Sequence, residues 1–268
     1  MKRLLLCADD YAIAPGVSAA IRDLVGAGRI NATSVMTVFP GLEDEAQALD
    51  AVAAGRRVSI GLHVTLTGPM APLTAGLGPA FGTLPGWIGA AFAGRLDAAA
   101  VAAEVEAQFA RFLSAFGRPP DHVDGHQHVH VLPTVRGAVL EATRRHAPEA
   151  ILRDVTPTPA ALRGFDAKGR LIGLFAHNFA RDARRRGLAT STGFGGAYDF
   201  TKDGDFAGLM ARVLGAVPEG GVVMVHPGHA DATLATRDRL IVPREREYTV
   251  LAGPDFPAIL QKAGVRLD

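Results

Sequence analysis

The sequence predicts a single α/β domain over residues 1–268, built as a barrel of about seven parallel strands. Short apolar runs alternate with helix-length segments, which is the pattern of successive βαβ units and a parallel sheet. Polar clusters come directly after several of these runs, where the carboxyl ends of barrel strands would meet. The length suits one such barrel, because about 250 residues is typical. No internal repeat or linker composition divides the chain.

In the first half of the chain, strands are expected where apolar residues run consecutively, and helices where they recur at helical spacing. Residues 4–8 open the chain as a strand buried on both faces. Pro15 and Gly16 open the first helix, and Gly28 ends it. The expected strands are 4–8, 32–38 and 58–64, and the expected helices are 15–27, 42–54 and 98–116.

Residues 68–86 interrupt this alternation with four prolines and five glycines. A long irregular connection in a compact domain is usually functional or mobile. We interpret it as a lid or groove wall beside a site, although a tolerated surface insertion explains it almost as well.

The second half continues the pattern, with a fourth strand that carries an unusual run of histidines. A loop rich in threonine and proline follows the fifth strand, and a glycine- and aromatic-rich loop occupies 193–200. Two short helices near the end precede a last strand. The expected strands are 122–130, 151–155, 189–192, 222–225 and 265–267, and the expected helices are 133–146, 174–186 and 205–214.

Composition narrows the class of protein. A formal net charge of +1 gives no reason to expect nucleic acid as a partner. No stretch is long and apolar enough to span a membrane, and the N-terminus lacks a signal-peptide pattern. The single cysteine, Cys7, excludes an internal disulfide and fits a reducing compartment, so we expect a cytoplasmic protein. Among leucines, Cys7 is interpreted as a core residue.

Polar side chains end or follow four of the expected strands: the first, the third, the fourth and the last long one. Asp9 and Asp10 come after the first strand, His63 ends the third, and His226 follows the last long one. Separately, the acids could cap the next helix, His63 could be a core histidine and His226 could mark a turn. At one barrel rim they would meet, and one Asp with two His suits Zn²⁺, Mg²⁺, Mn²⁺ or Co²⁺.

The fourth strand strengthens the case for a metal site. Alternate residues of a strand share one face. That face would carry His122, Asp124, His126, His128 and His130, which are hard to bury without a metal or a polar network. Spacing alone leaves open which of His126, His128 and His130 is the ligand.

Four motifs together resemble the YdjC-like (ChbG/HpnK) carbohydrate deacetylases. They are Ala8-Asp9-Asp10-Tyr11, Gly61-Leu62-His63-Val64-Thr65-Leu66-Thr67, the segment from His122 to His130, and Val225-His226-Pro227-Gly228. The match spans essentially the whole chain. The resemblance implies an irregular (β/α) barrel related to the NodB-type polysaccharide deacetylases.

Carried over by position, the resemblance implies a role for each of several polar residues. Asp10, His63 and His126 would hold one divalent metal ion, with Mg²⁺ or Zn²⁺ expected first. Asp9 would be the general base for the attacking water, and His226 would protonate the departing amine. Arg153 resembles an arginine that orients acidic or substrate groups near the site, although a plain surface ion pair explains it almost as well. His128 and His130 would lie behind the metal ligands or face the substrate. Asp124 would be a structural or orienting acid.

One departure from the family pattern lies beside the acids. The family usually has Asp-Asp-Phe-Gly, whereas this chain has Asp9-Asp10-Tyr11-Ala12. Ala12 replaces a glycine that would permit a positive φ or a close approach. The loop beside the metal can therefore differ in shape, which affects substrate identity more than metal binding.

The resulting hypothesis is removal of an N-acetyl group from an amino sugar, a chito-oligosaccharide or a glycolipid-linked amino sugar. Two alternatives remain open: a metal-dependent hydrolase of a non-sugar amide or ester, and a non-catalytic carbohydrate-binding protein. The expected partner is a small carbohydrate substrate, and family habit favours a homodimer.

Overall fold

The structure is a computed structural model that describes residues 1–156, 167–200 and 204–267. Its centre is a curled seven-stranded sheet in which every pair of neighbouring strands is parallel. The strand order is β6-β5-β4-β3-β2-β8-β7, so the first long strand lies near the middle of the sheet. The strands are β2 (Leu5–Tyr11), β3 (Ala32–Val35), β4 (Ser59–Val64), β5 (His122–Gly125), β6 (Ile151–Leu152), β7 (Phe194–Gly195) and β8 (Val222–Val225).

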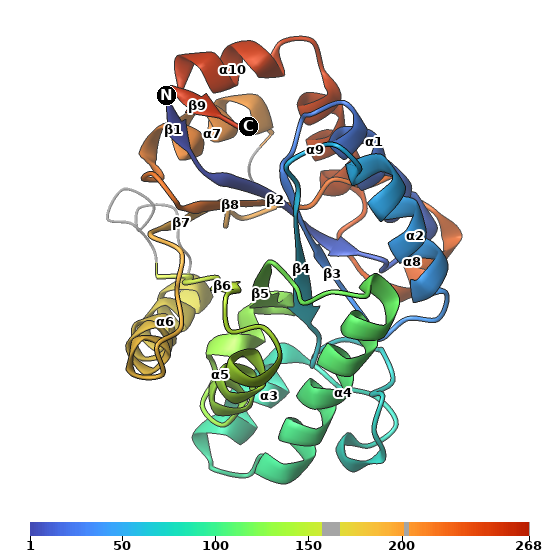
Figure 1. The fold of residues 1–268 in the computed structure, drawn as a ribbon, viewed down its shortest axis with the longest axis vertical. Helices are drawn as coiled ribbons and strands as arrows, with labels where there is room; N and C mark the ends of the chain where they lie inside the picture. The colour runs from blue at the N-terminus through green and yellow to red at the C-terminus, as the bar shows by residue number, and fades with distance from the viewer. Residues whose placement is uncertain (157–166, 201–203, 268) are drawn as a thin grey trace.

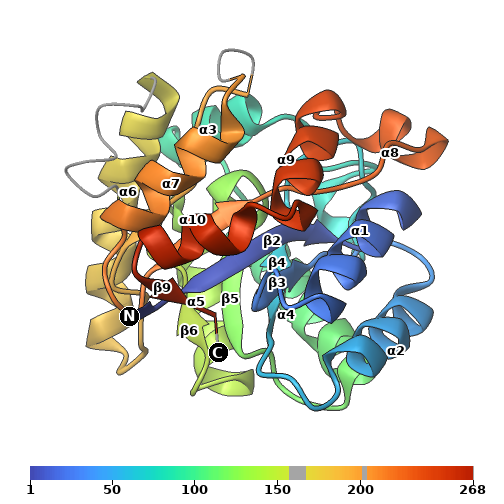
Figure 2. The same cartoon turned by 90° about the horizontal axis from the view of Figure 1, so that it is seen from above.

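Helices surround this sheet, and the two chain ends lie together because β1 (Lys2–Arg3) pairs with β9 (Val265–Arg266) (Figure 1). Seen from above, the strands occupy the centre and the helices the periphery (Figure 2). The helices are α1 (Pro15–Gly26), α2 (Leu42–Ala53), α3 (Leu84–Phe92), α4 (Ala98–Phe116), α5 (Val135–His146), α6 (Ala167–Arg185), α7 (Phe206–Ala216), α8 (Ala232–Arg237), α9 (Val242–Ala252) and α10 (Phe256–Lys262), with 3₁₀ turns η1 (Ala75–Leu77) and η2 (His126–Val131).

The two edges of the sheet are joined by one short segment. Leu152 of β6 donates its N–H to the carbonyl of Ala189 at 3.0 Å and accepts from the N–H of Ser191 at 2.9 Å. A few residues later, β7 pairs with β8. The sheet therefore curls into an irregular barrel, which confirms the predicted fold. The strand expected at 189–192 is represented by a bridge at Thr190, and the strand itself lies at Phe194–Gly195.

The buried core explains why these segments form these elements. Leu6, Cys7 and Ala8 of β2 are fully buried, as expected of a strand covered on both faces. The stripe Val101, Val105, Phe109 and Phe112 packs α4 inward. Its end at Gly117, which has a φ of 63°, is a left-handed cap that glycine favours. None of the helices in the described ranges is long and apolar enough to span a membrane.

Residues 68–86 are not a free loop. Gly68 pairs with Gly82, the segment contains η1, and its end begins α3, a helix that the sequence did not predict. The fully buried carboxylate of Glu104 on α4 accepts from the N–H groups of Leu73 and Thr74. A segment held by a buried carboxylate in this way fits a fixed wall better than a mobile lid.

Two further expectations need correction. The strand expected at 122–130 ends at Gly125, because Gln127 and His128 have φ values of 52° and 61° and turn the chain into η2. Three helices (α8, α9 and α10) replace the two short ones expected near the C-terminus. The threonine- and proline-rich loop falls mainly on residues 157–166, outside the described residues.

Candidate active site

The paired aspartates lie in a bulge of β2. Ala8 pairs with Thr33 and Tyr11 pairs with Val35, so β2 advances three residues where β3 advances two. Asp10 takes up the extra residue in the left-handed region, with a φ of 67°. Strict alternation would send adjacent side chains to opposite faces. The bulge instead brings both acids to His63, since Asp9 and Asp10 each offer an oxygen within 4.8 Å of one of its ring nitrogens.

Asp10, His63 and His126 converge on a point at the strand ends. Oδ1 of Asp10 lies 3.2 Å from Nε2 of His63 and 3.0 Å from Nδ1 of His126. One candidate ligand atom from each residue lies within 4.8 Å of the others. Asp10 and His63 are buried, while His126 remains partly exposed. A carboxylate and two imidazoles that meet in this way form a donor set suited to a divalent ion.

Asp124 orients His63 from behind. Its Oδ1 lies 2.6 Å from Nδ1 of His63, so Nε2 is turned toward Asp10. Burial alone would lower the pKa of His63, but the charge of Asp124 and the hydrogen bonds that the ring donates to Asp10 and Asp124 raise it to about 10. A divalent cation at Nε2 would replace that proton. A carboxylate behind a histidine ligand is a common feature of metal sites, so the residues present fit the implied metal.

Asp9 and Arg153 form a buried, two-pronged ion pair. The two terminal nitrogens of Arg153 donate to the two oxygens of Asp9 at 2.6 and 2.7 Å. Nη2 of Arg153 also lies 2.5 Å from Oδ2 of Asp124. Arg153 is only 1% exposed. The resemblance left open whether Arg153 orients acidic groups or substrate. In the structure its guanidinium contacts the acids Asp9 and Asp124.

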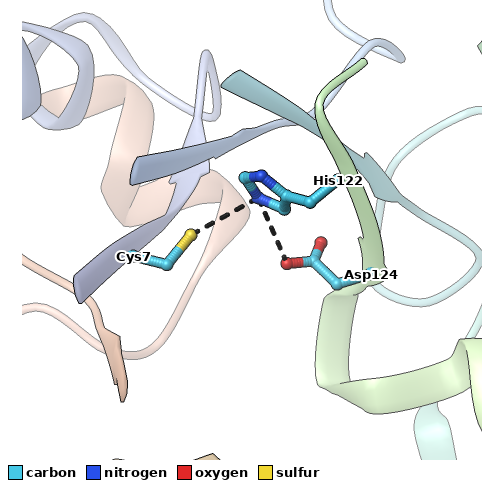
Figure 3. A group of neighbouring side chains, drawn as sticks. All are labelled: Cys7, His122 and Asp124. Atoms are coloured by element: carbon cyan, nitrogen blue, oxygen red, sulfur yellow. Dashed lines mark hydrogen bonds and ion pairs between the residues drawn. The ribbon is translucent and has the colours of Figure 1, made fainter. Parts of the chain in front are cut away.

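A second buried polar cluster lies beneath these residues. Figure 3 shows the His122 ring between the thiol of Cys7 and the carboxylate of Asp124. Oγ of Ser34 lies 3.3 Å from Sγ of Cys7, 3.0 Å from Nε2 of His122 and 2.6 Å from Oδ2 of Asp124. Burial raises the pKa of Cys7 well above its usual range, so the thiol remains protonated, as expected of a core residue.

The five polar residues expected on one strand face therefore separate into two groups. His122 and Asp124 belong to β5 and point into the buried cluster, while η2 carries the other three. His126 turns to Asp10, and Nε2 of His130 lies 3.0 Å from the carbonyl oxygen of Arg153. Because a carbonyl only accepts, that nitrogen of His130 is the donor. His128 is half-buried and meets the ring of Phe194 edge-on at 5.3 Å.

His226 follows β8 and lies against aromatic side chains. Its ring meets Phe200 edge-on at 5.4 Å, and its Nδ1 is buried with no hydrogen-bond partner among the described residues. Burial lowers the pKa of this imidazole. Its backbone N–H donates to Glu247, which also accepts from the hydroxyl of Tyr198 at 2.6 Å. Burial raises the pKa of Glu247 to about 7.

The sequence did not identify three polar residues around the site: Ser34, Arg244 and Glu247. Arg244 and Glu247 are fully buried on α9, and Nη2 of Arg244 lies 2.5 Å from Oδ2 of Asp10. Arg244 and Glu247 are three residues apart on a helix, and oppositely charged residues at this spacing are also common as surface ion pairs. Their spacing therefore did not mark them as buried. Ser34 lies inside an expected strand, where a serine carries no signal of its own.

An open pocket of about 480 Å³ lies beside the acidic bulge. Ala12 forms part of its lining, together with the prolines Pro15 and Pro40 and the charged side chains of Arg22 and Glu45. Ala12 has a φ of 72°, the left-handed conformation that its expected glycine would adopt more easily.

Comparison with known proteins agrees with this architecture. The model of the YdjC-like protein family matches residues 3–262. The chain is 29% identical over 269 residues to the chitooligosaccharide deacetylase of Yersinia pestis (strain Pestoides F), covering 99% of this chain and 97% of that protein. The protein of the same name from Yersinia pseudotuberculosis serotype O:1b (strain IP 31758) gives the same identity and coverage.

Among solved structures, a protein from Enterococcus faecalis V583 that is described as a cellobiose-phosphate cleavage protein has the same fold. The TM-score is 0.79 at 20% identity, over 100% of this chain and 97% of that one. The family match extends over nearly the whole chain and includes every residue of the site described above. The chain belongs to the YdjC-like protein family.

Proposed function

We propose that this protein is a metal-dependent hydrolase that removes the N-acetyl group of an amino sugar, a short chito-oligosaccharide or a glycolipid-linked amino sugar. The observation that carries the proposal is the convergence of Asp10, His63 and His126 beside the Asp9–Arg153 pair. The names of the Yersinia relatives, chitooligosaccharide deacetylases, support the choice of substrate class.

Asp10, His63 and His126 would hold the divalent cation. When bound, Mg²⁺, Zn²⁺, Mn²⁺ or Co²⁺ would polarise the acetyl carbonyl and make water a better nucleophile. Burial would raise the pKa of Asp10, but the charge of Arg244 and hydrogen bonds from both histidines hold it well below its usual range. Asp10 is therefore an anionic ligand, and Asp124 keeps Nε2 of His63 directed at it.

Asp9 is the proposed general base. Its two oxygens face Arg153, whose charge stabilises the carboxylate and holds it in place. Water adds to the acetyl carbonyl while Asp9 accepts its proton. Arg153 therefore acts as a positioning residue for the base.

His226 is the proposed general acid. As the carbon–nitrogen bond breaks, the imidazolium gives its proton to the departing nitrogen, so the products are acetate and a free amine. Burial lowers the pKa of His226, which makes its imidazolium a stronger acid. His128, near Phe194, is proposed to contact the sugar.

The test is acetate release, measured with each of the four metals, from N-acetylglucosamine, its short β-linked oligomers, an N-acetylated amino-sugar lipid, and simple acetamides and acetate esters. Release from the sugars alone supports the proposal. Turnover of the simple amides or esters in preference to sugars would overturn the substrate class. Sugar binding with no release under any metal would overturn the enzymatic proposal and favour a binding protein.

A further inference from the structure

A chain of hydrogen bonds runs through the buried cluster to His63. Oγ of Ser59 on β4 lies 2.8 Å from Nδ1 of His122, and Nε2 of that ring lies 3.0 Å from Oγ of Ser34 on β3. Ser34 donates to Oδ2 of Asp124 at 2.6 Å, and Oδ1 of Asp124 lies 2.6 Å from Nδ1 of His63. The residues come from three neighbouring strands, β3, β4 and β5.

The direction of each bond in this chain follows from proton counting. Oδ2 of Asp124 lies 2.5 Å from Nη2 of Arg153, and Oδ1 lies 2.6 Å from Nδ1 of His63, so both oxygens face N–H donors and accept. Ser34 has one hydroxyl proton and gives it to Asp124. The contact of 3.0 Å between Ser34 and His122 then needs a proton on Nε2 of His122. A thiol proton from Cys7 directed at Nε2, 3.6 Å away, would leave two lone pairs facing each other there.

The other end of the His122 ring is decided in the same way. Burial lowers the pKa of His122, so the neutral ring carries one proton, and it is on Nε2. Nδ1 must accept, and its partner is the hydroxyl of Ser59. On the far side of Asp124, the same argument places a proton on Nδ1 of His63, which leaves Nε2 to face Asp10.

The ring of His122 has little freedom to turn. A Cβ at Gly61 would lie 2.3 Å from its Cδ2 and Nε2, so the ring packs directly against the backbone of β4, and only glycine leaves room for it. Ser34, Asp124 and His122 are all buried, at 0%, 0% and 4% exposure. Solvent cannot substitute for a lost partner at this depth, so each donor in the chain depends on the next.

We propose that His122 and Ser34 are positioning residues that act through Asp124 to fix the tautomer and orientation of His63. This inference rests on the proposed metal site, to which it adds two residues that do not touch the metal. This relay of Ser59, His122, Ser34 and Asp124 fixes a proton on Nδ1 of His63, so Nε2 is the nitrogen that a cation would take. It lowers the reorganisation that metal binding would otherwise require.

The first test reads the tautomers directly by ¹⁵N NMR of the histidine rings in the metal-free protein. We expect His122 to carry its proton on Nε2 and to have an unprotonated Nδ1. A proton on Nδ1 of His122, or on both nitrogens at neutral pH, would overturn the relay. This measurement needs neither metal nor substrate, so its result is independent of the proposed function.

The second test measures Zn²⁺ affinity by calorimetry in the parent protein, Ser34→Ala and Thr33→Val. Thr33, next to Ser34 on β3, is the matched control, because its buried hydroxyl donates to the Ala8 carbonyl of β2 and is outside the relay. We expect Ser34→Ala to weaken Zn²⁺ binding about tenfold, the low end for a partner behind a metal ligand. Thr33→Val should bind as the parent does.

Outcomes of the second test separate the relay from the metal site. Equal Zn²⁺ affinity of Ser34→Ala and the parent would overturn the relay and leave the metal site intact. An equal loss of Zn²⁺ affinity in Ser34→Ala and Thr33→Val would show a general structural effect and would also overturn the relay. Absence of Zn²⁺ binding by the parent, checked against His63→Ala, would instead overturn the proposed metal site.

Discussion

Nη2 of Arg244 lies 2.5 Å from Oδ2 of Asp10, and the same nitrogen lies 2.5 Å from Oδ2 of Asp238. Arg244 and Asp10 are 0% and 1% exposed. Asp10 therefore divides its two oxygens, with Oδ1 toward the histidines and Oδ2 toward a buried arginine. Helix α9, near the end of the chain, thus completes a site that begins at the first long strand.

Replacing Arg244 should make folding depend on divalent metal. In Arg244→Leu, Asp10 keeps a buried charge with one cationic partner removed, and such losses cost about 3–5 kcal/mol. We expect urea unfolding with a chelator present to show this loss, and a divalent ion to restore part of it. Arg239→Leu, at an exposed arginine, is the control. A variant as stable as the parent under chelation would contradict the importance of this pair.

Removing His126 should remove the metal without unfolding the protein. His126 is partly exposed and its ring faces Asp10, so truncation to alanine leaves room that water can fill. We expect His126→Ala to retain the far-UV spectrum of the parent and to lose stoichiometric metal in elemental analysis after dialysis. His146→Ala, on α5 and paired with Glu106, should keep it. Full metal content in His126→Ala would exclude this histidine as a ligand.

Asp9→Asn should separate catalysis from metal binding. The amide cannot accept a proton from water, and loss of a general base costs about 10²–10⁴-fold in rate. Asp9 lies beside the candidate ligands and pairs with Arg153, so metal content should persist. The measurement is acetate release per metal-loaded protein. An Asp9→Asn enzyme with parent-like turnover would refute the assignment of Asp9 as base.

Ala12→Gly should stabilise the protein. Ala12 has a φ of 72°, and a left-handed conformation costs an L-residue about 1–2 kcal/mol. Part of the gain is offset by the greater freedom of glycine in the unfolded chain, so we expect about 1 kcal/mol in denaturant unfolding. Ala110→Gly, at an exposed position within α4, should instead lose about 1 kcal/mol. A loss of stability in Ala12→Gly would contradict backbone strain at this position.

Glu247 should make stability depend on pH. Its pKa rises from 4.5 to about 7 because it is buried, so the folded chain holds this proton more tightly than the unfolded chain does. Its contribution to stability is therefore greatest in acid, falls as pH rises from 4.5 to about 7, and stays low above that.

Comparison of Glu247→Gln with the parent by urea unfolding at about pH 5 and about pH 8 tests this linkage. The variant should gain relative to the parent at the higher pH, by an amount on the order of a few kcal/mol. Glu245→Gln, at an exposed carboxylate of the same helix, is the control. An unchanged difference between variant and parent at the two pH values would rule out a raised pKa.

Much of the site was predictable because it lies where parallel strands end. Asp9 and Asp10 follow the apolar run 4–8, His226 follows the run 222–225, and His63 ends the third expected strand. The strands of a barrel all point the same way. His126 was considered as part of a continuous strand, and the structure places it on η2 instead. It does not share a strand face with His122 and Asp124, because the chain leaves the strand after Gly125 through left-handed residues.

Arg244, Glu247 and Ser34 could not be predicted, since nothing near them in the sequence marks them as buried beside acids. Their roles depend on contacts between residues far apart along the chain: 234 positions separate Arg244 from Asp10, and 90 separate Ser34 from Asp124. Charge and polarity favour the surface unless a partner is present. Only the folded chain supplies that partner.

The sequence by itself determined the barrel and the rim at which Asp9 and Asp10 meet the histidines, because the pattern of apolar runs specifies both. The tertiary structure alone decided which side chains each of the two acids contacts. The bulge in β2 turns Asp10 into the left-handed region, toward His63, His126 and Arg244, and leaves Asp9 to Arg153. The physical reason is strand pairing: an extra residue in β2 is defined only against β3, so no property of the two adjacent residues reveals it.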